Sequence, residues 1–71
     1  MEKVIVSASG KKAVTIGSEH GGFFACFVQE DEGCDIRKGF GQVLEVKHFA
    51  TEKYAAQFAE SRLSAQRYST A

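Results

Sequence analysis

The sequence predicts a single α+β domain, a small antiparallel sheet of four to five strands with one C-terminal amphipathic helix packed on one face. Short β-branched and aromatic segments separated by glycine-containing turns make up residues 1–49. From about residue 52 the apolar residues recur at helical spacing instead. A chain of 71 residues has room for one domain, 1–71, and a body of that size has a small stability margin.

The first two strands are expected at about residues 3–8 and 13–17. Residues 3–8 are rich in β-branched side chains, and residues 9–12 supply the serine, glycine and lysines of a turn. Val14 and Ile16 then alternate around Thr15. This arrangement is typical of a β-hairpin.

The third strand, residues 23–29, is apolar on both of its alternating faces. One face carries Phe23, Ala25 and Phe27, and the other carries Phe24, Cys26 and Val28. A strand of this kind is typically central and covered on both sides. We therefore expect it in the middle of the sheet.

Two more strands are expected at about 34–38 and 42–49, with a bend at the glycines of residues 39–41. In the last strand two sets of side chains alternate, and the first set is the predicted core face. The first set is Leu44, Val46 and His48, and the second is Val43, Glu45, Lys47 and Phe49.

The helix is expected at about residues 52–66, with Thr51 as its N-cap and Glu52 in its first turn. Its apolar stripe consists of Ala55, Phe58, Ala59 and Leu63, with Tyr54 at the edge. Residues 68–71 are expected to be a frayed tail.

Composition argues against several classes of protein. Nine Lys and Arg balance nine Asp and Glu, so the chain lacks the net positive charge that drives nonspecific binding to nucleic acid. The first residues have no apolar run of signal-peptide length, and no segment approaches the roughly 20 apolar residues of a membrane span. Two cysteines are too few for a disulfide scaffold, so we expect reduced thiols, a cytoplasmic location and no membrane contact.

The residues that carry chemistry form no recognisable constellation. Cys26, Cys34, His20 and His48 lack the close pairwise spacing of zinc ligands, and the acidic residues at 30–35 do not follow the calcium-loop pattern. Cys26 is expected to be buried and unreactive, and Cys34 to be reachable by solvent. The sequence predicts no catalytic residue, no metal site and no cofactor.

Residues 38–43, Lys-Gly-Phe-Gly-Gln-Val, resemble the ribonucleoprotein-1 segment of RNA recognition motifs, in which aromatic residues on a strand stack bases. Gln42 and Glu45 stand where that segment has aromatic residues, and no helix is expected between the first two strands. The resemblance implies a module that binds single-stranded RNA or DNA, with four candidate residues. They are Arg37, Lys38, Phe40 and Lys47.

The last strand, the Phe-Ala-Thr-Glu turn and the alanine-rich helix are together similar to the end of the WGR domain of some DNA-damage proteins. The Trp-Gly-Arg triplet that defines that domain is missing, because the chain contains no Trp.

One helix of about 22 Å covers only one face of such a sheet, and the uncovered apolar face needs another cover. We therefore predict a non-enzymatic protein-interaction protein that forms a homodimer or binds another protein. The predicted interface consists of Phe23, Ala25, Phe27, Val43 and Phe49. By size alone the chain is comparable to accessory proteins and inhibitors of phages and other mobile elements. The alternative function is binding of single-stranded nucleic acid by the segment at 38–43.

Overall fold

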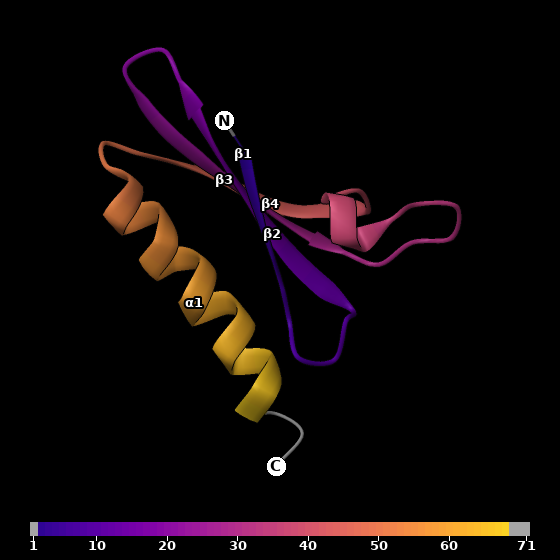
Figure 1. Cartoon of the computed structure of the whole chain (residues 1–71). Helices are drawn as coiled ribbons and strands as arrows, with labels where there is room; N and C mark the ends of the chain where they lie inside the picture. Colours follow the sequence, from indigo (N-terminus) through magenta and orange to yellow (C-terminus); the bar gives the residue numbers. More distant parts are fainter. Residues whose placement is uncertain (1, 69–71) are drawn as a thin grey trace.

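The computed structural model describes residues 2–68, which form an antiparallel sheet with one helix packed against it (Figure 1). Within these residues the sheet has four strands in the order of the chain. They are β1 (Glu2–Val6), β2 (Lys12–Glu19), β3 (Gly22–Gln29) and β4 (Gln42–Phe49). Helix α1 (Glu52–Tyr68) follows β4 directly. The predicted α+β architecture is therefore confirmed.

The two hairpin turns explain where the first three strands begin and end. Strand β1 ends at Val6 rather than at residue 8, because Ser7 begins the turn and its hydroxyl accepts a hydrogen bond from the Lys12 amide at 3.2 Å. Between β2 and β3 only two residues turn the chain, and Gly21 has the positive φ of 87° that this tight turn requires.

Residues 34–38 were predicted to be a strand, and this prediction is wrong. Ile36–Lys38 form a short 3₁₀ helix, η1, whose N-cap Asp35 accepts a hydrogen bond from the Arg37 amide at 3.0 Å. Gly39, with a φ of 87°, ends it by donating its amide to the Ile36 carbonyl. These local hydrogen bonds satisfy the backbone without a neighbouring strand, and the acidic and basic side chains remain exposed.

Helix α1 begins as predicted, because the Thr51 hydroxyl accepts a hydrogen bond from the Tyr54 amide at 3.4 Å. It continues to Tyr68, beyond the predicted end at residue 66. Of the tail expected to fray at 68–71, Tyr68 belongs to the helix and residues 69–71 lie outside the described part of the chain.

The core lies between α1 and one face of the sheet, which we call the helix face. Alanines line this contact on both sides, because Ala25 of β3 and Ala55 and Ala59 of α1 are all fully buried. The rest of the buried cluster is Val14, Ile16, Phe27 and Leu63. Small side chains at the centre allow the helix to approach the sheet closely, and the predicted stripe of the helix is the one that docks.

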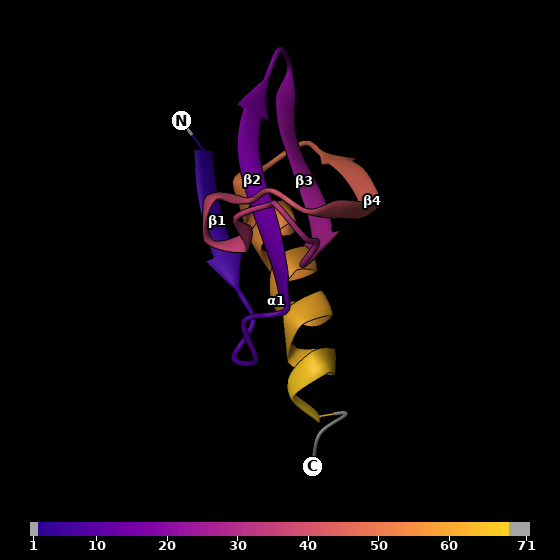
Figure 2. The same cartoon turned by 90° about the vertical axis from the view of Figure 1, so that its right-hand side faces the viewer.

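The opposite face of the sheet, which we call the outer face, is partly covered by the segment between β3 and β4. Figures 1 and 2 show η1 on the side of the sheet that faces away from α1. Gly39 lies against Thr15 and Val4, on strands β2 and β1. Ala13 and Val28, which pair across β2 and β3 on this face, are almost completely buried. The outer face is therefore closed at one end by the chain itself.

Candidate interaction surface

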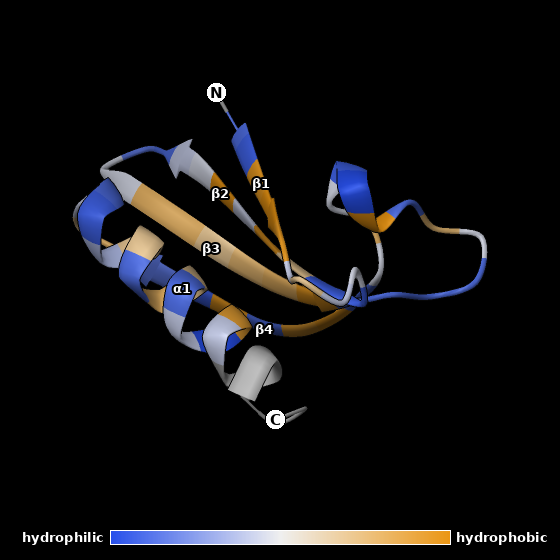
Figure 3. Ribbon diagram, turned by 60° about the horizontal axis from the view of Figure 1, so that its bottom comes forward, coloured by the Kyte–Doolittle hydropathy of each residue, from blue (hydrophilic) through white to orange (hydrophobic). Residues whose placement is uncertain are grey.

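Strand β4 is an edge strand, and its apolar side chains are the most exposed large ones in the sheet. β4 pairs with β3 on one side, and no described residue forms a strand on its other side. We call four residues on or just before β4 the β4 strip. They are Phe40, Val43, Leu44 and Val46, with exposed fractions of 61%, 56%, 44% and 49%. Apolar stretches of β4 and of the preceding segment are visible in Figure 3.

A bulge positions these side chains. Phe27 pairs with Glu45, whereas its neighbour Val28 pairs with Val43, so Leu44 is an extra residue in β4. Val43 and Val46 therefore both lie on the outer face, opposite Val28 and Cys26.

The predicted core face of β4 was wrong. Leu44, Val46 and His48 are exposed, whereas Phe49 of the other set is half-buried and packs against the core. The Phe49 ring lies 5.6 Å from the ring of Phe58 in α1, at an interplanar angle of 47°. The turn from β4 into α1 places the helix on the side of Phe49, and this geometry outweighs the greater hydrophobicity of the other face.

The predicted interface residues fall on different surfaces. Phe23, Ala25, Phe27 and Phe49 all belong to the core cluster or pack against it beneath α1. Only Val43 lies on an exposed surface. The reason is that α1 covers the face of β3 that carries Phe23, Ala25 and Phe27. The other face of β3 is the outer face, where Phe24 and Cys26 are half-buried.

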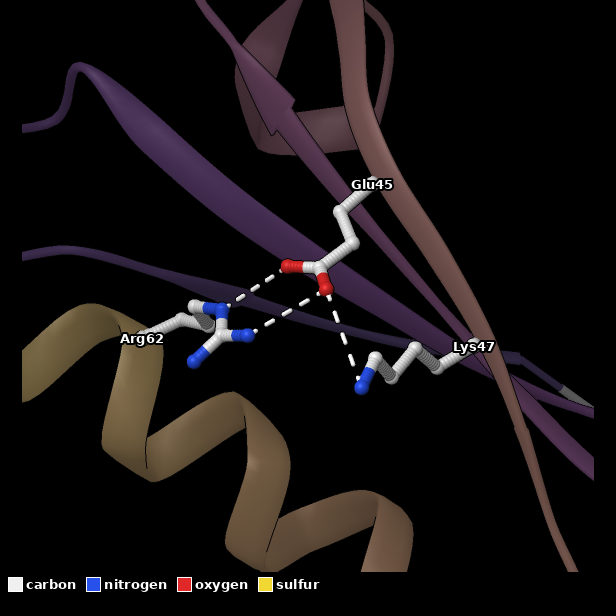
Figure 4. A network of polar contacts seen from close by, with 3 residues as sticks. All are labelled: Glu45, Lys47 and Arg62. Atoms are coloured by element: carbon white, nitrogen blue, oxygen red, sulfur yellow. Dashed lines mark hydrogen bonds and ion pairs between the residues drawn. The ribbon is translucent and has the colours of Figure 1, made fainter.

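A charged cluster lies at the β4 edge on the helix face (Figure 4). Arg62 of α1 donates from Nε to Glu45 Oε1 at 2.9 Å and from Nη2 to Oε2 at 3.2 Å. Lys47 Nζ lies 4.0 Å from the same Oε2. The hydrogen bond from Arg62, with the positive charges of Arg62 and Lys47, lowers the pKa of Glu45.

This cluster was not anticipated from the sequence, although a signal was present. Glu45 lies between the apolar residues Leu44 and Val46, and Arg62 lies late in the helix beside the apolar stripe. The Arg62 guanidinium also lies 4.6 Å from the centre of the Phe58 ring, so it links the helix to both a carboxylate and an aromatic ring.

The four candidate nucleic-acid-binding residues are not brought together on one surface. Arg37 and Lys38 are exposed on η1, and Phe40 follows them in the same segment. Lys47 lies instead on the helix face, beside Glu45. The exposed acidic residues of the same loop, among them Glu30, lie close to the two basic ones in the chain and offset their charge.

The cysteines and histidines are dispersed. Cys34 is exposed in the loop, whereas Cys26 is half-buried on the outer face, where burial raises the pKa of its thiol. His48 Nδ1 lies 2.8 Å from Glu19 Oε2 across the far end of the sheet. Among the described residues, no group of three or more His, Cys, Asp or Glu side chains is placed to hold a metal ion.

A groove of about 470 Å³ lies at the opposite edge of the sheet, between the end of β1 and helix α1. Ile5 and Val6 line one side, and Ala56 and Leu63 line the other. Within residues 2–68 no helix combines the length and hydropathy needed to cross a membrane.

Comparison of the chain with protein-family models, with curated proteins and with solved structures finds no match.

Proposed function

We propose that this chain is a non-enzymatic protein-interaction protein that acts as a homodimer through strand β4. The observation that carries the proposal is the β4 strip, a run of exposed apolar side chains along an unpaired strand edge. Exposed edge strands with apolar side chains tend to pair with another chain. Natural monomers usually protect such edges with charges, prolines, bulges or a covering segment. Strand β4 has a bulge at Leu44 and charges on the helix face, whereas Val43 and Val46 leave its outer face apolar and exposed.

Size supports the same proposal. A chain of this length buries a smaller fraction of its surface than a larger domain, and a second subunit is a common supplement to its core. Two-fold symmetric dimers are the commonest soluble assembly. The proposal includes a cytoplasmic setting, where free thiols stay reduced, and a role comparable to that of phage or mobile-element accessory proteins.

Sedimentation equilibrium at micromolar concentration tests the proposal. We expect a mass of twice the 7.7 kDa of one chain. Val46→Lys should return the mass to that of a monomer, because it places a charge at an exposed apolar position of the β4 strip. Tyr54→Lys is the matched control, since Tyr54 is also a large exposed apolar residue, at 56% against 49% for Val46, but lies on α1. A wild-type protein that stays monomeric, or equal effects of the two substitutions, would refute dimerisation through β4.

Binding of nucleic acid is the alternative outcome. Fluorescence anisotropy with a labelled single-stranded RNA measures it directly. Binding that weakens steeply as salt rises, and that Lys38→Ala reduces, would replace the interaction proposal with the nucleic-acid one.

A further inference from the structure

The free edge of β4 restricts how two copies can pair. A two-fold axis that joins β4 to its own copy in an antiparallel ladder passes beside one residue, which then faces itself across the axis. That residue defines the register of the whole ladder. In every such register the two helices lie on the same side of the joined sheet, because paired residues share a face.

The charges of β4 distinguish the three registers in which the axis passes beside Glu45, Val46 or Lys47. Glu45 and Lys47 lie on the helix face, with Val46 between them on the outer face. An axis at Glu45 places two glutamates opposite each other, and an axis at Lys47 does the same with two lysines. Like charges directly opposite each other destabilise a strand pair, and opposite charges stabilise it.

An axis at Val46 gives a complementary arrangement. Glu45 of each copy then faces the partner's Lys47, which makes two opposite-charge pairs on the helix face. On the outer face Val46 packs against the partner's Val46, so the β4 strips of the two copies meet at the axis.

Within one copy, Glu45 and Lys47 are already placed so that each can pair with the opposite charge of a second copy. Two hydrogen bonds from Arg62 hold the Glu45 carboxylate at the edge of the sheet. Lys47 is exposed, and within the described part of the chain its ion pair is the 4.0 Å contact with that carboxylate. Its ammonium group can therefore turn to the partner's Glu45 while Glu45 of its own chain remains paired with Arg62 (Figure 4).

We propose that two copies pair antiparallel along β4 with the two-fold axis at Val46, in a register set by Glu45 and Lys47. This inference rests on the proposed function and specifies its geometry. The two sheets, each of four strands, join as one continuous sheet with both helices on one face. The bulge at Leu44 interrupts regular pairing on either side of the axis, so the ladder is short and the register depends strongly on its central residues.

Disulfide trapping tests the register. Cys26 pairs with Val46 across β3 and β4, so the background carries Cys26→Ala and Cys34→Ser. Only a residue at the axis faces its own copy at disulfide distance. We expect Val46→Cys to form a cross-linked dimer at least tenfold faster than Val43→Cys or His48→Cys, which are also exposed on the outer face.

The outcomes separate this inference from the proposed function. Faster trapping at residue 43 or 48 would overturn the Val46 register, and so would failure of all three variants to cross-link while the mass remains that of a dimer. In both cases dimerisation itself would stand. A monomeric mass would refute both the dimer and its register.

Charge exchange provides an independent test. Lys47→Glu should weaken the dimer about tenfold, because each Glu45 would then face a glutamate. Lys53→Glu, the same change of charge at an exposed position of α1, should have no effect. Glu45→Lys alone should also weaken the dimer, but an equimolar mixture with Lys47→Glu should form heterodimers, since both pairs are then of opposite charge. Failure of the mixture to associate, with both variants folded by circular dichroism, would overturn the proposed pairing.

Discussion

At the scale of single residues, the contact between Gly39 and Thr15 shows how the outer face is closed. Gly39 has a φ of 87°, and a Cβ atom at this position would collide with the Thr15 hydroxyl and lie 3.3 Å from Val4 Cγ2. The Thr15 hydroxyl is buried and has no hydrogen-bond partner among the described residues. The segment with η1 therefore packs against the sheet at a place where a buried hydroxyl makes no hydrogen bond, which costs free energy.

Substitution of Gly39 measures the contribution of this packing. Gly39→Ala and Gly33→Ala should each lower the free energy of unfolding by about 1–2 kcal/mol, because both glycines have a positive φ. Gly39→Ala should lower the free energy of unfolding by about 1–3 kcal/mol more than Gly33→Ala does, because only the methyl group at residue 39 would collide with the sheet. Urea unfolding measures both free energies. Equal losses would mean that the segment does not rest on β1 and β2.

At the scale of elements, α1 is attached to the sheet at two places of different chemistry. The buried alanines and Leu63 hold it over β2 and β3. The Arg62 pair with Glu45 ties it to the edge strand β4. The Phe49–Phe58 ring contact and the Arg62 pair with Glu45 together set the position of the helix relative to β4.

The ion pair predicts a pH dependence of stability. The pKa of Glu45 is lowered in the folded chain, so its contribution is present above the ordinary carboxyl pKa of about 4.3. That contribution is lost as the pH falls through the lowered value. Glu45→Gln should therefore reduce the melting temperature at pH 6–7, and the difference from wild type should shrink as the pH falls below about 4.

The control for this prediction is the same substitution in an Arg62→Gln background. There the pH-dependent part of the difference should largely disappear, because the main cause of the lowered pKa is absent. A difference between wild type and Glu45→Gln that is constant from pH 7 to pH 3 would contradict the role assigned to the pair.

At the scale of the whole molecule, the two faces of the sheet are covered unequally. On the helix face α1 covers β2 and β3, whereas the outer face has η1 against β1 and β2 and the exposed β4 strip at the other edge. Burial of a valine or leucine side chain is worth about 1.5–3 kcal/mol. A second copy would recover part of this free energy.

The stability of a dimer depends on protein concentration, because association stabilises only the folded chain. We expect the melting temperature of the wild type to rise between about 1 and 100 μM protein by several degrees. The melting temperature of Val46→Lys should not change over the same range. A wild-type curve as flat as that of the variant would indicate a monomer.

The sequence alone determined the elements that depend on local patterns. The hairpin of β1 and β2, the two-sided strand β3 and the helix that begins after Thr51 follow from alternation, glycine turns and a capping residue. The segment at 34–38 escaped prediction because its Asp35 and Gly39 caps favour a 3₁₀ turn, although its composition is compatible with a short strand.

Only the tertiary structure decided which face of each strand is buried. Strand β3 is apolar on both faces, so its own pattern cannot indicate the side on which the helix lies. In β4 the more hydrophobic face is the exposed one, because the chain turns at residues 50 and 51 so that α1 packs beside Phe49. That choice buries Phe23, Ala25 and Phe27, pairs Glu45 with Arg62 and leaves Val43 and Val46 on an open edge. The Glu45–Arg62 contact joins residues 17 positions apart, and such a contact has no periodic signature in the sequence.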